Sequence, residues 1–440
     1  GKASRKCRSM TFHGILFRNA ADWALEHGVS ELEFFGDLNL DQIIAAVTDG
    51  KDEYDLKPFF HLPLHDVDDV TFRQEVMRDL ERPRLFVDME AFAESMREMR
   101  QYVAQAENIY GKLQKQRWFL DAVDIYCDAV SRLADRLSRT ELASRGLMAF
   151  RDYVTRYAAS DGFTSLVRRT NKLTADLSAI HYAILIRGPH VQVRRYDGEG
   201  DYGVEVATTF EKFKQGAVDD YAFSFTNSPE MNHIEAMILD QVAKLYPDIF
   251  LELENYVTGH ENFADSTIIT FDREIQYYVA YLGYIAQFRK AGLNFCYPSV
   301  TRSCKEVYNY QGFDFALACK LIKQNSVPVC NDFHLKGRER IIIVSGPNQG
   351  GKTTFARTFG QLHYLASLGC PVPGKKAQLF LFNEILTHFE KEEDITNFRG
   401  KLQDDLIRVH DILEHATPNS AIIMNEVFTS TTFRDAGVLS

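Results

Sequence analysis

The chain has 440 residues, enough for about two to four domains with a substantial core. Its composition, 45% hydrophobic and 25% charged, is typical of a soluble globular protein, and the net charge of −11 excludes a surface coated all over with nucleic acid but not a local basic patch. No apolar run reaches about 18 residues and no signal peptide is visible, so we expect a cytoplasmic protein with no membrane partner. The seven cysteines are scattered without metal-ligand spacing, so we expect reduced thiols.

The first half of the chain has mainly helical periodicity. After a mixed stretch over residues 1–85, apolar residues recur every three or four positions from Phe92 through Tyr110 to Leu113, and again from Phe119 to Leu137. This spacing predicts long amphipathic helices that continue to about residue 180.

The period changes at about residue 181. Short apolar or alternating runs over 181–188, 190–200 and 201–209 are separated by Gly-Pro and Asp-Gly-Glu-Gly, which predicts small antiparallel strands. Helical spacing returns over 230–250 and 273–292, so a helical body is interrupted by a small β-rich insert.

The segment IIIVSGPNQGGKTTF fits the phosphate-loop pattern G-x-x-x-x-G-K-[ST] from Gly346 to Thr353. A buried strand is expected over 341–344 and a helix after the loop, so that backbone N–H groups would point at a phosphate from the helix N-terminus. Lys352 would reach the β- and γ-phosphates, and the Thr353 hydroxyl would bind Mg²⁺. The residues expected to contact ATP here are Gly346, Pro347, Asn348, Gln349, Gly350, Gly351, Lys352, Thr353 and Thr354.

A second apolar run, AIIMNEV over 421–427, ends in Asn425 and Glu426. Glu426 is the candidate catalytic base that polarises the attacking water. Lys352 is the other candidate catalytic residue. Asn425 stands where an acidic residue usually supports Mg²⁺ and its waters, so it is the second candidate Mg²⁺ residue.

These segments resemble one family. SGPNQGGKTT (345–354), LASLGCPVPGKKAQL (365–379) and MNEVFTSTTFRDAG (424–437) are similar, in sequence and in order, to the ATPase domain of the MutS family of DNA mismatch-repair and DNA-structure-binding proteins. The match is strong over about 330–440. Asn331 belongs to an Asn-Asp pair ahead of the strand expected over 341–344. It is similar to a residue that precedes the family's nucleotide site, and the nearby Phe333 is a candidate adenine contact.

The resemblance implies a multidomain fold: a mainly α-helical core and lever body with a small β-rich clamp-like insert, followed by an α/β P-loop NTPase domain. The expected parts are the N-terminal part of the core (1–85), the first half of the lever (86–180), the clamp-like insert (181–225), the second half of the lever (226–293) and the ATPase domain (294–440), which we expect to be truncated at its C-terminus.

Three further roles are implied by the resemblance. Ser430, Thr431 and Thr432 correspond to a signature that the family presents to the γ-phosphate of a partner subunit, which implies a homodimer. The insert corresponds to a clamp that grips the DNA backbone, with Arg187, Arg194 and Arg195 as candidate phosphate contacts. A solvated or salt-bridged strand face explains these arginines equally well.

The sequence also departs from the family pattern. Asn425 replaces the usual Asp, which weakens the expected grip on Mg²⁺ and could slow turnover. In the segment 400–406 only the acidic position, Asp405, is kept. The mismatch-reading domain with its Phe-x-Glu wedge has no counterpart, so we expect distorted or branched DNA rather than a simple mispair as the substrate.

The function that the sequence predicts is a Mg²⁺-dependent ATPase whose nucleotide-driven dimer closure controls binding to mismatched, branched or otherwise distorted DNA, in repair or recombination control. Three alternatives stay open. One is a P-loop ATPase head of another dimeric type that acts on a partner other than DNA. The others are a small-molecule kinase and an ATP-binding switch that hydrolyses too slowly to act as a motor.

Overall fold

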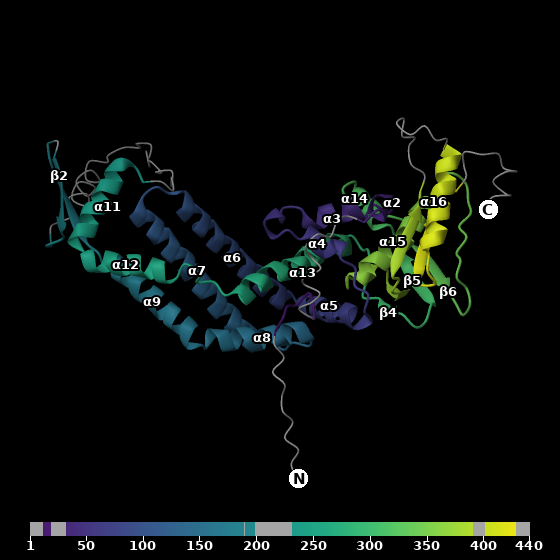
Figure 1. Ribbon diagram of the computed structural model, residues 1–440, viewed down its shortest axis with the longest axis horizontal. Coiled ribbons are helices and arrows are strands. Elements are labelled where there is room, and N and C mark those ends of the chain that lie inside the picture. Colours follow the sequence, from purple (N-terminus) through teal and green to yellow (C-terminus); the bar gives the residue numbers. More distant parts are fainter. Residues whose placement is uncertain (1–11, 19–31, 189, 199–230, 390–400, 428–440) are drawn as a thin grey trace, which may run out of the picture. The chain divides into compact units, whose positions relative to one another are not determined.

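The computed structural model describes residues 12–18, 32–188, 190–198, 231–389 and 401–427. These residues form two compact units. The first takes those within Gly1–Glu90, Arg139–Tyr153 and Ser266–Ser440, and the second those within Ala91–Ser138 and Val154–Asp265. Both units are mainly helical; among the described residues the first carries three small sheets and the second one hairpin (Figure 1). The predicted division into five parts is finer than this one and stays a prediction.

The second unit is built from long amphipathic helices. Its helices are α7 (Lys112–Ser138), α9 (Asp161–Ser178), α11 (His233–Leu245) and α12 (Pro247–Gly259), together with the later turns of α6 (Pro83–Asn108) and α8 (Arg145–Ala158). The predicted seam of α7 is confirmed, since Val123, Tyr126 and Val130 are buried. The predicted continuation from Phe92 to Leu113 as one helix is wrong: α6 ends at Asn108, Tyr110 is 99% exposed, and Gly111, a poor helix former, precedes α7.

The predicted β-insert begins with a hairpin. Strand β1 (Tyr182–Arg187) pairs antiparallel with β2 (His190–Arg195), and β2 packs beside α11 (Figure 1). The third predicted strand, over 201–209, lies outside the described residues.

The first unit contains the candidate nucleotide-binding segments. Its helices are α2 (Phe34–Leu38), α3 (Leu40–Thr48), the 3₁₀ helix η2 (Asp52–Tyr54), α4 (Lys57–His61), α5 (Val67–Leu80), the first turns of α6 and α8, α13 (Ser266–Lys290), α14 (Phe315–Ile322), α15 (Lys352–Ser367) and α16 (Lys401–His415). Helix α13 is at the centre of the core, with Tyr277, Tyr278 and Tyr281 fully buried.

The strands of the first unit form three small sheets beside α15 and α16 (Figure 1). A four-stranded sheet has the order β4-β8-β5-β6, and two-stranded sheets join β10 to β9 in parallel and β3 to β7 antiparallel. The strands are β3 (Phe295–Cys296), β4 (Ser299–Thr301), β5 (Val307–Gly312), β6 (Asn331–Leu335), β7 (Val372–Pro373), β8 (Lys376–Phe380), β9 (Glu384–His388) and β10 (Ser420–Met424).

The buried strand predicted over 341–344 is wrong in this structure. No strand is formed there, and Ile341 and Ile343 are 80% and 88% exposed. A strand exists only where a neighbour satisfies its backbone, and no described strand pairs with this run. The run instead lines a cavity of about 690 Å³ together with residues of β10, so the two segments face one cavity without a ladder between them.

Within the described residues, no helix combines the length and the apolar character that crossing a membrane would require.

Candidate functional site

The loop before α15 is a tight glycine turn. Gly351, the N-cap of α15, has a φ of +86°, and Gln349 also has a positive φ of 64°. The amide of Gly350 donates to the Pro347 carbonyl at 3.1 Å, and a Cβ on Gly350 would lie 2.9 Å from that oxygen. Glycine is therefore required at 350 by the close approach and at 351 by the backbone angle. The turn leaves the first amides of α15 without intrahelical partners, which suits an anion.

Lys352 curls back over this loop. Its Nζ donates to the carbonyl of Gly346 at 3.0 Å, and the carbonyl of Pro347 and Oδ1 of Asn348 both lie at 3.4 Å. The ammonium group is thus held at the mouth of the loop by neutral acceptors. A phosphate oxygen would be a stronger, charge-assisted partner for the same group.

The second predicted motif meets the loop directly. The Thr353 hydroxyl donates to Oδ1 of Asn425 at 3.0 Å, across 72 residues of sequence. Asn425 directly follows β10, and its amide donates to the His388 carbonyl at 2.8 Å, which extends the pairing of β10 with β9 by one bond. The next residue, Glu426, is exposed and has a φ of +54°. A non-glycine residue in this region is uncommon and marks a turn under constraint.

One cavity gathers these groups. Lys352, Asn425 and Glu426 all line the 690 Å³ cavity, a volume in the usual range for small-molecule sites. The cations Lys305 and Arg340 and the ring of Phe380 line it as well. The structure therefore brings together the predicted base, the predicted lysine and the predicted Mg²⁺ residues.

The available oxygen atoms fit a Mg²⁺ ion that takes only part of its ligands from the protein. Thr353 and Asn425 supply two neutral oxygens 3.0 Å apart, and Mg²⁺ prefers oxygen ligands and commonly takes the rest from phosphates and water. Within the described part of the chain no three His, Cys, Asp or Glu side chains form a self-sufficient metal cage.

A buried pair, His388 and Asp405, supports the second motif. His388, whose carbonyl holds Asn425, is fully buried, and its Nε2 lies 3.3 Å from Oδ1 of Asp405. Burial, assisted by the Arg408 charge, lowers the pKa of His388, while Asp405 acts in the opposite direction. We assign a neutral imidazole at pH 7, because desolvation is the largest cause. Asp405 is the acidic residue that is kept in the segment 400–406, whereas His388, the last residue of β9, gave no comparable signal in the sequence.

Asn331 and Phe333 do not line the cavity that holds Lys352. Both belong to β6, and Phe333 is 5% exposed, with its ring packed against Phe355 and Phe359 of α15. Their expected adenine and nucleotide contacts stay predictions. Ser430, Thr431 and Thr432 lie outside the described residues.

The three predicted DNA-contacting arginines divide between the two faces of the hairpin. Residues directly opposite each other share a face, so the pairs Ala183–Arg194 and Arg187–His190 place Arg187 and Arg194 on one side. Arg195 is on the other side, where its Nε and Nη2 donate to the Leu245 carbonyl at 3.2 and 2.6 Å and its guanidinium covers the Tyr246 ring. Arg195 therefore caps the end of α11, whereas Arg187 and Arg194 share the opposite face of the hairpin.

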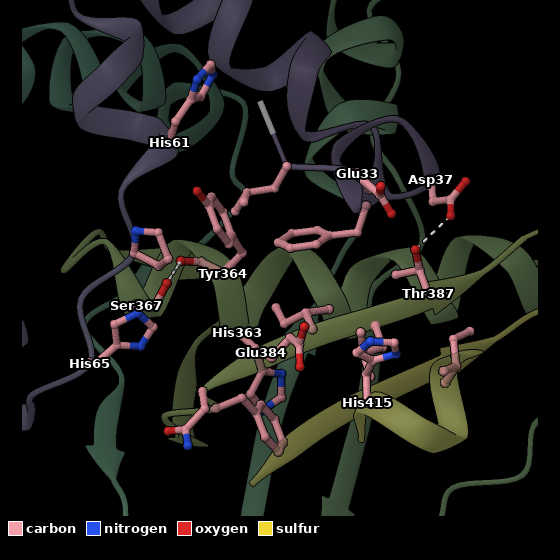
Figure 2. Close-up of a pocket in the computed structure, with 18 of the residues that line it drawn as sticks. Glu33, Asp37, His61, His65, His363, Tyr364, Ser367, Glu384, Thr387 and His415 are labelled. Carbon is pink, nitrogen blue, oxygen red and sulfur yellow. Dashed lines mark hydrogen bonds between the residues drawn. The ribbon is translucent and has the colours of Figure 1, made fainter. Parts of the chain in front are cut away.

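A second cavity of the first unit, of about 790 Å³, lies between α2, α15, β9 and α16 (Figure 2). Figure 2 shows Asp37 of α2 accepting a hydrogen bond from the Thr387 hydroxyl of β9, at 2.7 Å. The Asp37 carbonyl also accepts from Nε of Arg357 on α15, 320 residues away in sequence. The short helix α2 is thus hydrogen-bonded to α15, which follows the phosphate loop, and to β9, which pairs with β10.

Comparisons with known proteins find similarity in the part of the chain that carries this site. The family model described as MutS domain V matches residues 342–440. The chain is 27% identical over 220 residues to the DNA mismatch repair protein MutS of Shouchella clausii, which covers 48% of this chain and 24% of that protein. It is 31% identical over 166 residues to the DNA mismatch repair protein MutS of Petrotoga mobilis, covering 34% of this chain and 20% of that protein. The matched residues thus span about a quarter or less of the length of these curated relatives.

Proposed function

Since the C-terminal part of this chain belongs to the MutS family, we propose that the protein is a Mg²⁺-dependent ATPase that couples its nucleotide state to DNA binding. The observation that carries the proposal is the 3.0 Å hydrogen bond from Thr353 to Asn425. It joins the phosphate loop to the second motif at the cavity that Lys352 and Glu426 also line.

Each residue has a distinct role in the proposed reaction. The first amides of α15 and the Lys352 ammonium bind the phosphates and stabilise the charge that develops on the γ-phosphoryl group. Glu426 orients the attacking water, and its exposed carboxylate at the cavity edge is accessible for that role. Thr353 and Asn425 would hold Mg²⁺, which, when bound with ATP, would neutralise phosphate charge.

The proposed DNA contact is the hairpin face that carries Arg187 and Arg194. Two cations on one face of the hairpin suit contacts to the DNA backbone that carry no base readout. Arg195 is not part of the proposed contact, because it belongs to the other face of the hairpin, where its guanidinium donates to the Leu245 carbonyl. Distorted or branched DNA as the preferred substrate, and a homodimer with Ser430, Thr431 and Thr432 reaching the partner's γ-phosphate, are proposed on the family resemblance.

The enzymatic proposal is tested by phosphate release from the intact protein and from Lys352→Ala and Glu426→Ala. We expect each substitution to lower kcat by about 100-fold or more, the usual cost of removing a group that acts in the transition state. Equal phosphate release by all three proteins would remove the enzymatic claim.

The DNA proposal is tested separately, with homoduplex, mismatched, looped and four-way-junction DNA at one stated salt concentration, with and without ATP. Arg194→Ala is expected to weaken binding to all DNA forms, whereas the matched variant Arg195→Ala is expected to affect thermal stability more than affinity. If ATP changes no preference for any DNA structure over plain duplex, the alternative is favoured: a P-loop ATPase head of another dimeric type that acts on a partner other than DNA.

A further inference from the structure

The C-terminal end of α15, remote along the helix from the phosphate loop, is closed by a complete capping motif. The amide of Cys370 donates to the Leu365 carbonyl and that of Gly369 to the Ala366 carbonyl, both at 3.0 Å. These are the two bonds of a Schellman motif, and Gly369 has the left-handed backbone that it needs, with a φ of +77°.

The next two carbonyls of this end are held by other elements of the core. Ser367 accepts from the Leu64 amide at 2.9 Å. The Leu368 carbonyl accepts twice, from the Tyr277 hydroxyl of α13 at 2.9 Å and from Nη1 of Arg73 of α5 at 3.2 Å. The end of α15 is therefore fastened to two other helices through one oxygen atom.

Arg73 is an unusual residue for this position because it is fully buried. Its Nε donates to the Leu16 carbonyl at 3.0 Å, its guanidinium lies 5.1 and 5.4 Å from the ring centres of Phe17 and Tyr277, and its Nη2 has no hydrogen-bond partner in the described structure. Burying an arginine with one unsatisfied nitrogen costs stability. The cation is compensated in part by the negative end of the α15 dipole, on which it lies.

We propose that Arg73 and Tyr277 are positioning residues for the nucleotide site. By fixing the Leu368 carbonyl, they determine the position of the N-terminal end of α15, which carries Lys352 and Thr353. This inference rests on the proposed ATPase function. Helix α15 has 16 residues, about 24 Å of rigid rod, so a shift or tilt at one end reaches the other. A displacement of about 1 Å at a reacting centre can lower a rate up to about 100-fold.

The test compares two hydroxyl deletions on the same helix. Tyr277→Phe removes the bond to Leu368, while Tyr278→Phe removes an equally buried hydroxyl that donates to the Ile15 carbonyl instead. Both variants keep the ring and are expected to fold. Arg73→Lys, which keeps the charge but loses the fork of donors, is the second variant on the proposed contact.

We expect Tyr277→Phe and Arg73→Lys to lower kcat about 3- to 10-fold with the KM for ATP changed less than about twofold, at a temperature where thermal melting shows all variants to be folded. Tyr278→Phe is expected to keep the wild-type kcat even if its Tm falls as much. Equal kcat in Tyr277→Phe and Tyr278→Phe would overturn the inference.

A second readout does not need activity. Amide hydrogen exchange in peptides covering residues 346–356 is expected to be faster in Tyr277→Phe than in Tyr278→Phe, because a loosened rod frees its first turn. Equal exchange there contradicts the positioning role. A wild-type protein without Lys352-dependent hydrolysis would instead contradict the proposed function, and the exchange experiment would still decide this inference.

Discussion

Helix α15 begins half-buried next to an exposed loop and ends in the core, and its two ends are built in opposite ways. At the first turn, Gly351 has open space around it, and Lys352 is held by weak neutral acceptors of its own loop. At the last turn, Gly369 is pressed against Arg73, and the Leu368 carbonyl accepts two hydrogen bonds from other helices.

The difference follows from what each end has to do. Groups that must exchange their partners for a ligand have to be held weakly, so the phosphate end contributes little to folding. The core end can place that loose loop accurately only if it is itself rigid. We therefore expect substitutions at the core end of α15 to lower the stability of the fold most, and substitutions at the phosphate end to affect mainly ligand binding.

The largest effect is expected for Gly369→Ala. An added Cβ would lie 2.6 Å from Cβ of Arg73, and the φ of +77° disfavours any side chain. The backbone term is roughly 1–2 kcal/mol and the overlap roughly 1–3 kcal/mol, so we expect a loss of about 4 kcal/mol in the free energy of unfolding, measured by urea denaturation.

The matched control is Gly351→Ala at the other end of the same helix. Its φ of +86° carries the same backbone penalty, but an added Cβ meets nothing within 4 Å. We expect a loss of only about 1–2 kcal/mol in stability, together with weakened ATP binding. If the two substitutions destabilise the protein equally, the two ends are not energetically different.

A pH-dependent loss of stability is expected from His363 in the buried half of α15. Burial lowers the pKa of His363 from 6.5 to about 4, and its Nδ1 is paired with the Phe359 carbonyl while Nε2 has no partner among the described residues. Because the folded state holds this group neutral, its contribution is complete above pH 6.5 and is lost as the pH falls towards 4. The loss amounts to about 3 kcal/mol between pH 7 and pH 4.

The measurement compares urea denaturation of wild type and His363→Gln over that pH range, since all other groups are shared. Wild type should lose about 3 kcal/mol more than the variant. Parallel pH profiles would mean that His363 is accessible to protons, and that this half of α15 is less tightly packed than its contacts indicate.

How much of this could be predicted from sequence depends on the range of the interaction. The 3.6-residue spacing of α7 and the short apolar run of β10 are local patterns, and both elements form. The phosphate loop is equally local, since its glycines are required by the turn itself. Thr353 and Asn425 were each expected to support Mg²⁺, and the structure places these two residues in contact.

What the sequence did not reveal is non-local. The run 341–344 has the composition of a buried strand, but whether it pairs depends on neighbours that its own residues do not specify. Arg73 and His388 are single polar residues within ordinary helix and strand patterns. Arg73 donates to the distant Leu368 carbonyl, and the His388 carbonyl accepts from the distant Asn425 amide. The bond from Tyr277 to Leu368 spans 91 residues and leaves no periodic signal.

The smallest effect is expected at the phosphate end, where Asn425 stands in place of a carboxylate. Its Oδ1 already accepts from Thr353, so Asn425→Asp adds a charge at an oxygen that is in place and requires no rearrangement of β10. Added ligand charge strengthens Mg²⁺ binding, and we expect the Mg²⁺ concentration for half-maximal ATP hydrolysis to fall about 5- to 10-fold, which is about 1 kcal/mol. Asn425→Ala, which removes the oxygen, should shift it the opposite way, while the Tm of both variants stays near that of wild type because this end carries little of the folding energy. An unchanged Mg²⁺ requirement in both variants would place the ion away from Asn425, and a large fall in Tm would mean that the loop end of α15 contributes to folding as the core end does.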